Sequence, residues 1–205
     1  MALKKVLLLD LDDTLISTLN RQFSVLNDFF EQILKKPFCS FEVYKKHKSD
    51  NLSNLNIYKR YDLDHAKNEL LYQDYFQENI EKEKYLSKDS LLVDMNIFKS
   101  LNLKYTLNIL SLRKQSNNAM RQMEIMGFTK LIDTFYFLPH EKNDNPKIKK
   151  ISELKSREII FAFVGDSESD RKAAESTGVK YFHVDREFNL SDKQSTSINN
   201  VLKKL

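Results

Sequence analysis

The chain has 205 residues, of which 41% are hydrophobic and 30% charged, as is usual in globular proteins and not in disordered ones. Its formal net charge is only +4, and its basic residues are interleaved with acidic ones, so a dedicated nucleic-acid-binding protein is not expected. No apolar run approaches the roughly 20 residues that a membrane-spanning helix needs, which excludes an integral membrane protein.

The single cysteine, Cys39, excludes an intramolecular disulfide and a cysteine-based zinc site. The apolar run ahead of Asp10 is too short for the hydrophobic region of a signal peptide. We therefore expect a protein of a reducing compartment, the cytoplasm. The chain also lacks a glycine-rich phosphate loop, which excludes a P-loop and a dinucleotide-binding fingerprint.

The first predicted element is a buried strand over residues 6–9, a short and continuous apolar run. Such runs are typical of strands in parallel sheets that are covered on both faces. Similar runs follow much later, at residues 105–110, 134–138, 159–164 and 179–184.

Helical patterns separate these later runs. One spans residues 117–126 and stops at Gly127, where helices commonly end. Another begins at Asn145-Pro146, an N-cap followed by proline at the first helical position, and a third spans residues 167–177. This alternation predicts an α/β fold, a Rossmann-like parallel sheet of about five strands with helices on both faces.

The region between about Ser17 and Ser100 has a different pattern. Its apolar residues recur at helical spacing, and we find no strand-like run in it. We therefore predict an α/β core of residues 1–16 and 101–205, with an all-helical insert of residues 17–100 after the first strand. The insert is rich in Phe and Tyr, most of which we expect to pack in its core, leaving one or two to line a small-molecule pocket.

The first predicted strand runs directly into the segment Asp10-Leu11-Asp12-Asp13-Thr14. Residues i and i+2 of a strand point to the same side, so the first two carboxylates should face one way. The carboxyl ends of the strands are also where open α/β sheets bind ligands. An acidic turn is the alternative interpretation, because Asp favours turns.

A second strand end carries carboxylates as well. The run that ends at Gly165 is followed by Asp166 and Asp170. Two remote strands thus deliver these carboxylates and those of Asp10 and Asp12 to one edge of the sheet. So many anions repel one another unless they are compensated. Because Mg²⁺ binds a few carboxylates and takes phosphate oxygens as further ligands, we predict a magnesium site at this edge.

The two acidic motifs, in this order on a parallel sheet, resemble those of the haloacid dehalogenase-like (HAD) superfamily. The superfamily has two further motifs, a Ser or Thr at the end of the next core strand and a Lys ahead of the Gly-Asp strand. Ser111 and Lys147 resemble these residues, and Lys142 in the preceding loop is an alternative lysine. A helical insert between the first and second motifs resembles the superfamily's C1 cap.

The resemblance implies a Mg²⁺-dependent phosphomonoester hydrolase that forms an aspartyl-phosphate and acts on a small phosphorylated metabolite. Asp10 would be the nucleophile, and Asp12 would act as general acid and then as general base. Thr14 would orient the loop, Ser111 would bond the phosphoryl oxygens, and Lys147 would neutralise the nucleophile and the phosphate.

The same resemblance implies a set of metal ligands, namely Asp10, the backbone carbonyl of Asp12, and Asp166, with Asp170 supporting either the metal shell or Lys147. Related dehalogenases and phosphonatases lack an acid at the position of Asp12. Carboxylates at both positions therefore favour phosphoester chemistry.

Two residues near the motifs stay open to interpretation. Asp13 stands where many relatives carry Gly, and a turn-forming role fits it. Arg113 fits either a contact with substrate or cap, or a surface salt bridge.

Other functions fit the same residues. One is a phosphotransferase or sugar-phosphate mutase, and another is a catalytically silent HAD-fold binding protein. A phosphatase of nucleic-acid ends is permitted, although not favoured, by the mild positive charge. The sequence indicates neither the substrate nor the oligomeric state.

Overall fold

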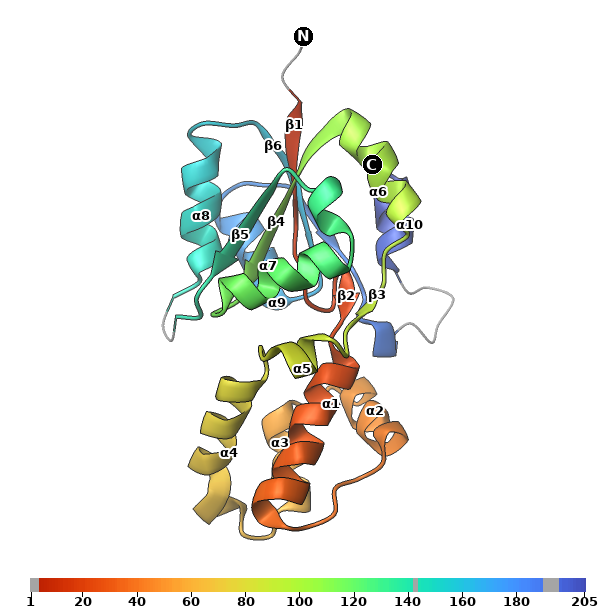
Figure 1. Cartoon of the computed structure of the whole chain (residues 1–205). Coiled ribbons are helices and arrows are strands. Elements are labelled where there is room, and N and C mark those ends of the chain that lie inside the picture. Colours follow the sequence, from red (N-terminus) through yellow and green to blue (C-terminus); the bar gives the residue numbers. More distant parts are fainter. Residues whose placement is uncertain (1–3, 142–143, 190–195) are drawn as a thin grey trace. The chain divides into compact units, whose positions relative to one another are not determined.

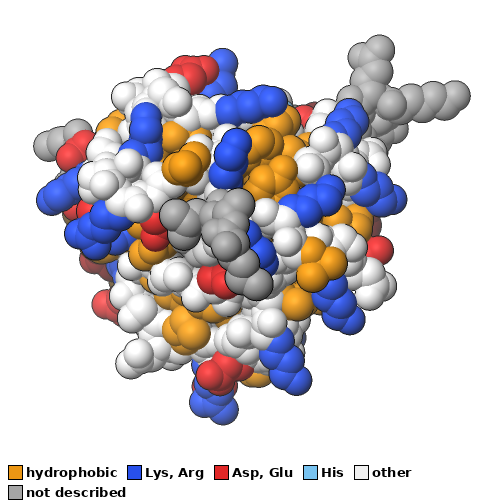
Figure 2. Space-filling model, turned by 90° about the horizontal axis from the view of Figure 1, so that it is seen from above, with side chains coloured by type: hydrophobic (Ala, Val, Ile, Leu, Met, Phe, Trp, Pro, Cys, Tyr) orange, Lys and Arg blue, Asp and Glu red, His pale blue; other side chains and the backbone are white. Residues whose placement is uncertain are grey.

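The computed structural model describes residues 4–141, 144–189 and 196–205. The chain divides into two compact units, one formed by Met1–Ser17 with Ser90–Leu205 and the other by Thr18–Asp89. None of the described helices is long and apolar enough to cross a membrane. On the face seen in Figure 2, the Lys and Arg side chains are scattered among acidic and hydrophobic ones.

The first unit, the sheet unit, is built on a parallel sheet of five strands in the order β5-β4-β1-β6-β7 (Figure 1). The strands are β1 (Lys5–Leu9), β4 (Tyr105–Leu112), β5 (Thr134–Leu138), β6 (Ile160–Gly165) and β7 (Tyr181–His183). The predicted Rossmann-like sheet is confirmed. Because the chain adds β4 and β5 on one side of β1 and then crosses to β6 on the other, the strand order reverses beside β1.

Helices cover both faces of this sheet. They are α6 (Met95–Lys104), α7 (Ser116–Ile125), α8 (Pro146–Lys155), α9 (Glu168–Ser176) and α10 (Ile198–Lys203). Leu7 and Leu9 of β1 pack in a core with side chains of α6, α7 and α10. Val6 and Leu8 point to the other face and pack with side chains of α8 and α9. Burial on both faces explains why Val6–Leu9 of β1 are all apolar.

The predicted ends of two of these helices agree with the structure. Gly127, just beyond α7, has a φ of 81°, a left-handed conformation that costs glycine little. The side chain of Asn145 caps α8 by accepting a hydrogen bond from the N–H of Lys147, and Pro146 takes the first helical position. This cap sets where Lys147 emerges from the helix.

The second unit, the helical insert, contains only helices. They are α1 (Leu19–Asp28), the π-helical turn η1 (Phe29–Leu34), α2 (Phe41–Ser49), α3 (Asn54–Tyr61), α4 (His65–Asn79) and α5 (Glu83–Leu86). Aromatic side chains form the core of the insert. Tyr58 stacks on Tyr72 with ring centroids 4.3 Å apart, and the ring centroids of Phe29 and Tyr75 of α4 lie 5.3 Å apart.

The insert is shorter than the predicted range of 17–100. Ser90–Leu91 form β3, which pairs antiparallel with β2 (Ile16–Ser17) in the sheet unit, so the predicted absence of strands is wrong there. Helix α6 also belongs to the sheet unit, because its Phe98 is buried against the sheet core. Sequence periodicity shows that α6 is a helix, but an apolar Phe suits a helical core and a sheet core equally well.

Candidate active site

Asp10 is the first residue beyond β1, at the edge of the sheet where β1 and β6 end. Its backbone N–H donates to the carbonyl of Val164 on β6, with an N···O distance of 2.8 Å. Asp166 follows the last residue of β6. The pairing of β1 with β6 therefore puts Asp10 and Asp166 on adjacent strand ends, where the strand order reverses.

A tight loop returns the chain after Asp10. The N–H of Thr14 donates to the carbonyl of Leu11 at 3.3 Å, and Asp13 has a φ of 57°. Asp adopts this left-handed conformation more readily than most residues do. The loop brings the Thr14 hydroxyl to 3.0 Å from Oδ1 of Asp166 and 3.4 Å from Oδ2 of Asp10.

Asp170 is held by the first turn of α9. The Ser167 hydroxyl accepts a hydrogen bond from the N–H of Asp170, and Oδ2 of Asp170 accepts one from the N–H of Ser167, which forms a capping box. A Cβ at Gly165 would lie only 2.7 Å from Oδ2 of Asp170. The close approach of α9 to the end of β6 therefore requires glycine.

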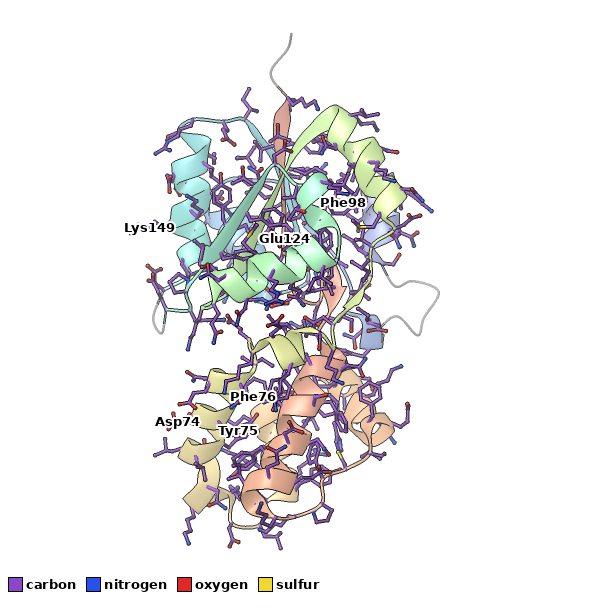
Figure 3. The ribbon with its side chains drawn as sticks, in the orientation of Figure 1. Asp74, Tyr75, Phe76, Phe98, Glu124 and Lys149 are labelled. Carbon is purple, nitrogen blue, oxygen red and sulfur yellow. The ribbon has the colours of Figure 1, made fainter. Side chains whose placement is uncertain are left out.

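Lys147 emerges from the first turn of α8 and joins two of the carboxylates. Its Nζ donates to Oδ1 of Asp10 and to Oδ1 of Asp170, each at 2.6 Å, and its side chain is only 4% exposed. Lys149, on the same helix, is exposed and points away from the sheet (Figure 3). The alternative lysine, Lys142, lies outside the described residues.

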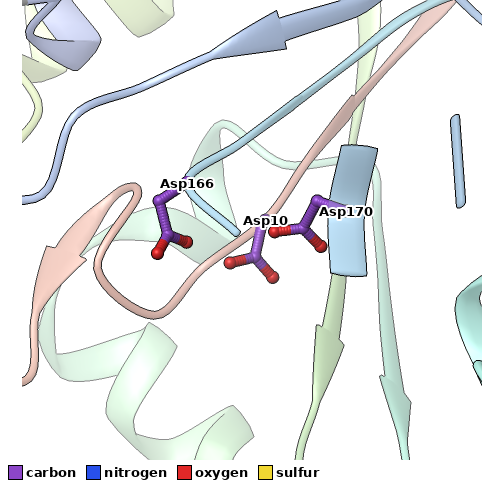
Figure 4. A group of neighbouring side chains, drawn as sticks. All are labelled: Asp10, Asp166 and Asp170. Atoms are coloured by element: carbon purple, nitrogen blue, oxygen red, sulfur yellow. The ribbon is translucent and has the colours of Figure 1, made fainter. Parts of the chain in front are cut away.

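The carboxylates of Asp10, Asp166 and Asp170 converge, with one oxygen of each lying within 4.8 Å of the others (Figure 4). Burial raises the pKa of Asp10 well above its usual value, the neighbouring carboxylates of Asp170 and Asp166 raise it further, and Lys147 opposes both effects. Burial alone would lower the pKa of Lys147, but the two carboxylates beside it outweigh that effect and keep the pKa high. The negative charges thus exceed what Lys147 neutralises.

Two arginines also contact the acidic residues. Nη2 of Arg113 lies 2.5 Å from Oδ1 of Asp12, and Nε of Arg186 lies 2.5 Å from Oδ2 of Asp166. Burial raises the pKa of Asp166, and Arg186 opposes that shift. Arg113 is buried, so of the two predicted roles the surface salt bridge is wrong. Sequence reasoning missed Arg186, although it follows the predicted strand at 179–184 and so stands near a strand's carboxyl end.

Ser111 lies near the carboxyl end of β4, beside β1, and is buried. Among the described residues, no hydrogen bond joins its side chain to Asp10 or to Lys147. The structure therefore puts Ser111 at the same edge of the sheet as the acidic residues, without a direct contact to them.

The donor set fits a hard divalent cation. Two carboxylate oxygens, Oδ2 of Asp10 and Oδ1 of Asp166, have no basic side chain against them among the described residues, and both lie near the Thr14 hydroxyl. The single proton of the Thr14 hydroxyl can be donated to only one of these two oxygens at a time. The pair can therefore still accept a cation as a further partner. Asp170 differs, because Lys147 and the capping box take both of its oxygens.

Comparison with known families defines the class of the protein. Residues 7–184 match the family model of the haloacid dehalogenase-like hydrolases. Because this match covers most of the chain, the protein belongs to that family, and the resemblance seen in its motifs is confirmed.

Solved structures share the fold at low sequence identity. A Clostridium difficile protein, provisionally named a phosphatase, is 16% identical with a TM-score of 0.66, over 94% of this chain and 89% of its own. A Thermotoga maritima protein, provisionally named a beta-phosphoglucomutase, is 17% identical with a TM-score of 0.65, over 98% and 99%. A provisional phosphoglycolate phosphatase of Lactobacillus plantarum is 16% identical with a TM-score of 0.62, over 93% and 89%. No curated protein matches the chain.

Proposed function

We propose that the protein is a Mg²⁺-dependent phosphomonoester hydrolase that acts on a small phosphorylated metabolite through an aspartyl-phosphate on Asp10. The observation that carries the proposal is Lys147, buried between Asp10 and Asp170 at 2.6 Å from an oxygen of each. It holds Oδ1 of Asp10, while Oδ2 lies 3.4 Å from the Thr14 hydroxyl. A carboxylate restrained in this way is oriented to attack an electrophile.

Asp10, Asp166 and the backbone carbonyl of Asp12 would hold the Mg²⁺ ion. When bound, Mg²⁺ supplies positive charge for the carboxylates and for the phosphoryl oxygens of the substrate. Because both oxygens of Asp170 are already hydrogen-bonded, we assign Asp170 the support of Lys147 and not a metal ligand's role.

In the first step, an oxygen of Asp10 attacks phosphorus and the ester P–O bond breaks, leaving an aspartyl-phosphate. Asp12 donates a proton to the departing alkoxide oxygen, so that an alcohol leaves. Lys147 offsets the charge on the phosphoryl oxygens. Ser111 would donate a hydrogen bond to one of those oxygens, a contact that needs the substrate in place.

In the second step, Asp12 takes a proton from a water molecule as that water attacks phosphorus. The bond between phosphorus and the Asp10 oxygen breaks, which releases inorganic phosphate and restores both aspartates. The Asp12 side chain is 30% exposed, so it is accessible both to a leaving group and to water.

A phosphotransferase or mutase is the second candidate, favoured by the similarity in fold to the provisionally named beta-phosphoglucomutase. It would use the same residues and pass the phosphoryl group to an alcohol in place of water. Product analysis with added alcohols and sugar phosphates separates the two, because transfer yields a new phosphoester and hydrolysis yields inorganic phosphate.

We also propose that the helical insert selects the substrate and that the protein works in the cytoplasm. In a family member with this insert, the core would act on the phosphoryl group and the insert would contact the rest of the molecule. Variants of exposed insert residues would then change the preference among phosphorylated metabolites, while activity on a small aryl phosphate would survive.

The test is hydrolysis of a panel of phosphorylated metabolites with Mg²⁺. We expect Asp10→Asn to remove hydrolysis while leaving the melting temperature close to that of the wild type, since an amide is not a nucleophile. The exposed Glu158, beyond α8 in the sheet unit, gives a control, because Glu158→Gln also removes one negative charge and lies outside both the site and the insert. An Asp10→Asn protein with near wild-type activity would contradict the aspartyl-phosphate mechanism.

A further inference from the structure

We infer that Arg113 is a positioning residue, which holds the Asp12 carboxylate in the orientation needed for proton transfer to the leaving group. The inference rests on the proposed function, because it presumes that Asp12 acts as the general acid. It concerns an arginine to which the sequence motifs give no role.

Arg113 is anchored to the sheet unit at both ends. Its backbone N–H donates to the carbonyl of Leu138 on β5 at 2.8 Å, which continues the pairing of β4 with β5. At the other end, Nη2 donates to Oδ1 of Asp12 at 2.5 Å and lies 3.5 Å from Oε1 of Gln122 on α7. Because Arg113 is held at both ends, it fixes the Asp12 carboxylate relative to the sheet.

The two partners differ in burial. The Arg113 side chain is 1% exposed, whereas that of Asp12 is 30% exposed. The arginine therefore binds one carboxylate oxygen from the protein interior, while the Asp12 side chain stays partly exposed. A general acid needs this combination, a restrained carboxyl group that is exposed enough to reach the atom that takes its proton.

A gain in folding stability does not explain the ion pair between Arg113 and Asp12. Nε and Nη1 of Arg113 are buried and have no hydrogen-bond partner among the described residues. Buried N–H groups without acceptors cost free energy, and a buried ion pair gains little over an apolar pair of the same volume. We therefore attribute the buried guanidinium to its effect on the orientation of the Asp12 carboxylate.

The test compares Arg113→Gln with the wild type on two esters, p-nitrophenyl phosphate and glycerol phosphate, with Mg²⁺ present. The value of kcat/KM reports the step that expels the leaving group. An alkoxide needs a proton as it departs, whereas p-nitrophenolate departs without one. We expect Arg113→Gln to lower kcat/KM for glycerol phosphate by about tenfold to a hundredfold and for the aryl ester by only about threefold.

Three companion variants sharpen the comparison. Arg113→Lys keeps the charge but not the planar fork, and we expect an intermediate loss with the same dependence on the leaving group. If Arg113→Gln does not fold, Arg113→Lys carries the test alone. Asp12→Asn should show the same dependence in stronger form. Arg157→Gln is the matched control, since Arg157 is 70% exposed and pairs with Glu153 on α8.

Equal losses on both esters, in Arg113→Gln and Arg113→Lys alike, would overturn the inference, because a purely structural role lowers both rates in parallel. A wild-type protein that hydrolyses neither ester would instead contradict the proposed function. A larger loss on the alkyl ester, absent in Arg157→Gln, supports Arg113 as the residue that positions Asp12.

Discussion

At the scale of single residues, the geometry of the site depends on backbone conformation as much as on the acidic side chains. Asp13 takes a left-handed φ of 57° in the loop after β1, a conformation that glycine adopts most easily. Asp can occupy this position because it tolerates that region better than branched residues do. The loop keeps its shape, and Thr14 returns to within 3.0 Å of Asp166.

Gly165 is the second such position, and it gives a direct prediction. Gly165→Ala would place a Cβ 2.7 Å from Oδ2 of Asp170 and 2.8 Å from its Cβ. We expect α9 to shift, which moves Asp170 away from Lys147. The free energy of unfolding should fall by about 1–3 kcal/mol, and hydrolysis should fall by more than tenfold, roughly the 1.4 kcal/mol of a tenfold change.

Thermal unfolding and kcat, measured on the same preparations, check this prediction. Gly178→Asn is the matched control, because Gly178 has a φ of 64°, which Asn tolerates, and nothing closer than 3.7 Å to its added Cβ. Wild-type activity in Gly165→Ala would show that the contact between Lys147 and Asp170 does not matter for the reaction.

The sequence predicts much of the candidate site, because it indicates two strand ends and one helix start. The apolar runs before Asp10 and Asp166 predict that both lie at the carboxyl edge of a parallel sheet, and the structure brings them together. The Asn-Pro pair predicts the helix start that carries Lys147. Arg186 was not predicted, because an arginine beyond a strand has no spacing that distinguishes a partner of Asp166 from a solvated side chain.

At the scale of elements, the helical insert contains a buried carboxylate whose role can be tested by pH. Asp62 is fully buried and accepts hydrogen bonds from Tyr58 at 2.9 Å, Asn68 at 3.0 Å and Lys36 at 3.1 Å. Burial by itself would raise the pKa of Asp62, but these donors outweigh it and hold the pKa below its usual value.

A lowered folded-state pKa means that the ionised carboxylate stabilises the fold above its unfolded-state pKa, about 3.9. This stabilisation is lost as the pH falls through the lower, folded-state pKa. We expect Asp62→Asn to lower the free energy of unfolding at pH 7 by about 1–3 kcal/mol, and we expect the difference from the wild type to shrink below about pH 4.

Urea unfolding at pH 7, 5 and 3.5, followed by circular dichroism, measures this difference. Asp64→Asn is the control, since Asp64 also pairs with Lys36 but is 69% exposed. A difference between Asp62→Asn and the wild type that stays constant from pH 7 to pH 3.5 would mean that the charge of Asp62 does not stabilise the insert.

Element types followed from the sequence more reliably than element boundaries. The continuous apolar runs of β1 and β6 are accommodated by burial between two helical layers. The short β3 could not be predicted, because its two residues, Ser90 and Leu91, are defined only by pairing with β2. In α4, the apolar Leu70 stays 75% exposed, so helical spacing of apolar residues predicted the helix but not every buried side chain.

At the scale of the whole molecule, one edge of the sheet unit holds more negative than positive charge. The carboxylates of Asp10, Asp166 and Asp170 converge there, and among the described residues the basic side chains paired with them are Lys147 and Arg186. A polypeptide that buries excess negative charge is less stable until a cation binds. Binding of Mg²⁺ should therefore stabilise the fold as well as enable the proposed reaction.

The size of this stabilisation follows from mass action. A ligand that binds only the folded state, at a hundred times its Kd, stabilises by about 2.7 kcal/mol. We expect Mg²⁺ to raise the melting temperature of the wild type and EDTA to reverse the effect. Asp166→Asn should remove the Mg²⁺-dependent increase, because it removes a charge whose oxygen Oδ1 has no basic partner among the described residues.

Arg186 should act in the opposite direction. Its Nε lies 2.5 Å from Oδ2 of Asp166, so its positive charge competes with a cation for the same carboxylate. We expect Arg186→Gln to tighten Mg²⁺ binding by about tenfold, or roughly 1.4 kcal/mol, measured by calorimetric titration without substrate. Arg171→Gln serves as the control, because the exposed Arg171 pairs with Glu168 and not with the converging carboxylates. Weaker Mg²⁺ binding in Arg186→Gln would mean that the arginine orients Asp166 for the metal, so that orientation outweighs charge competition.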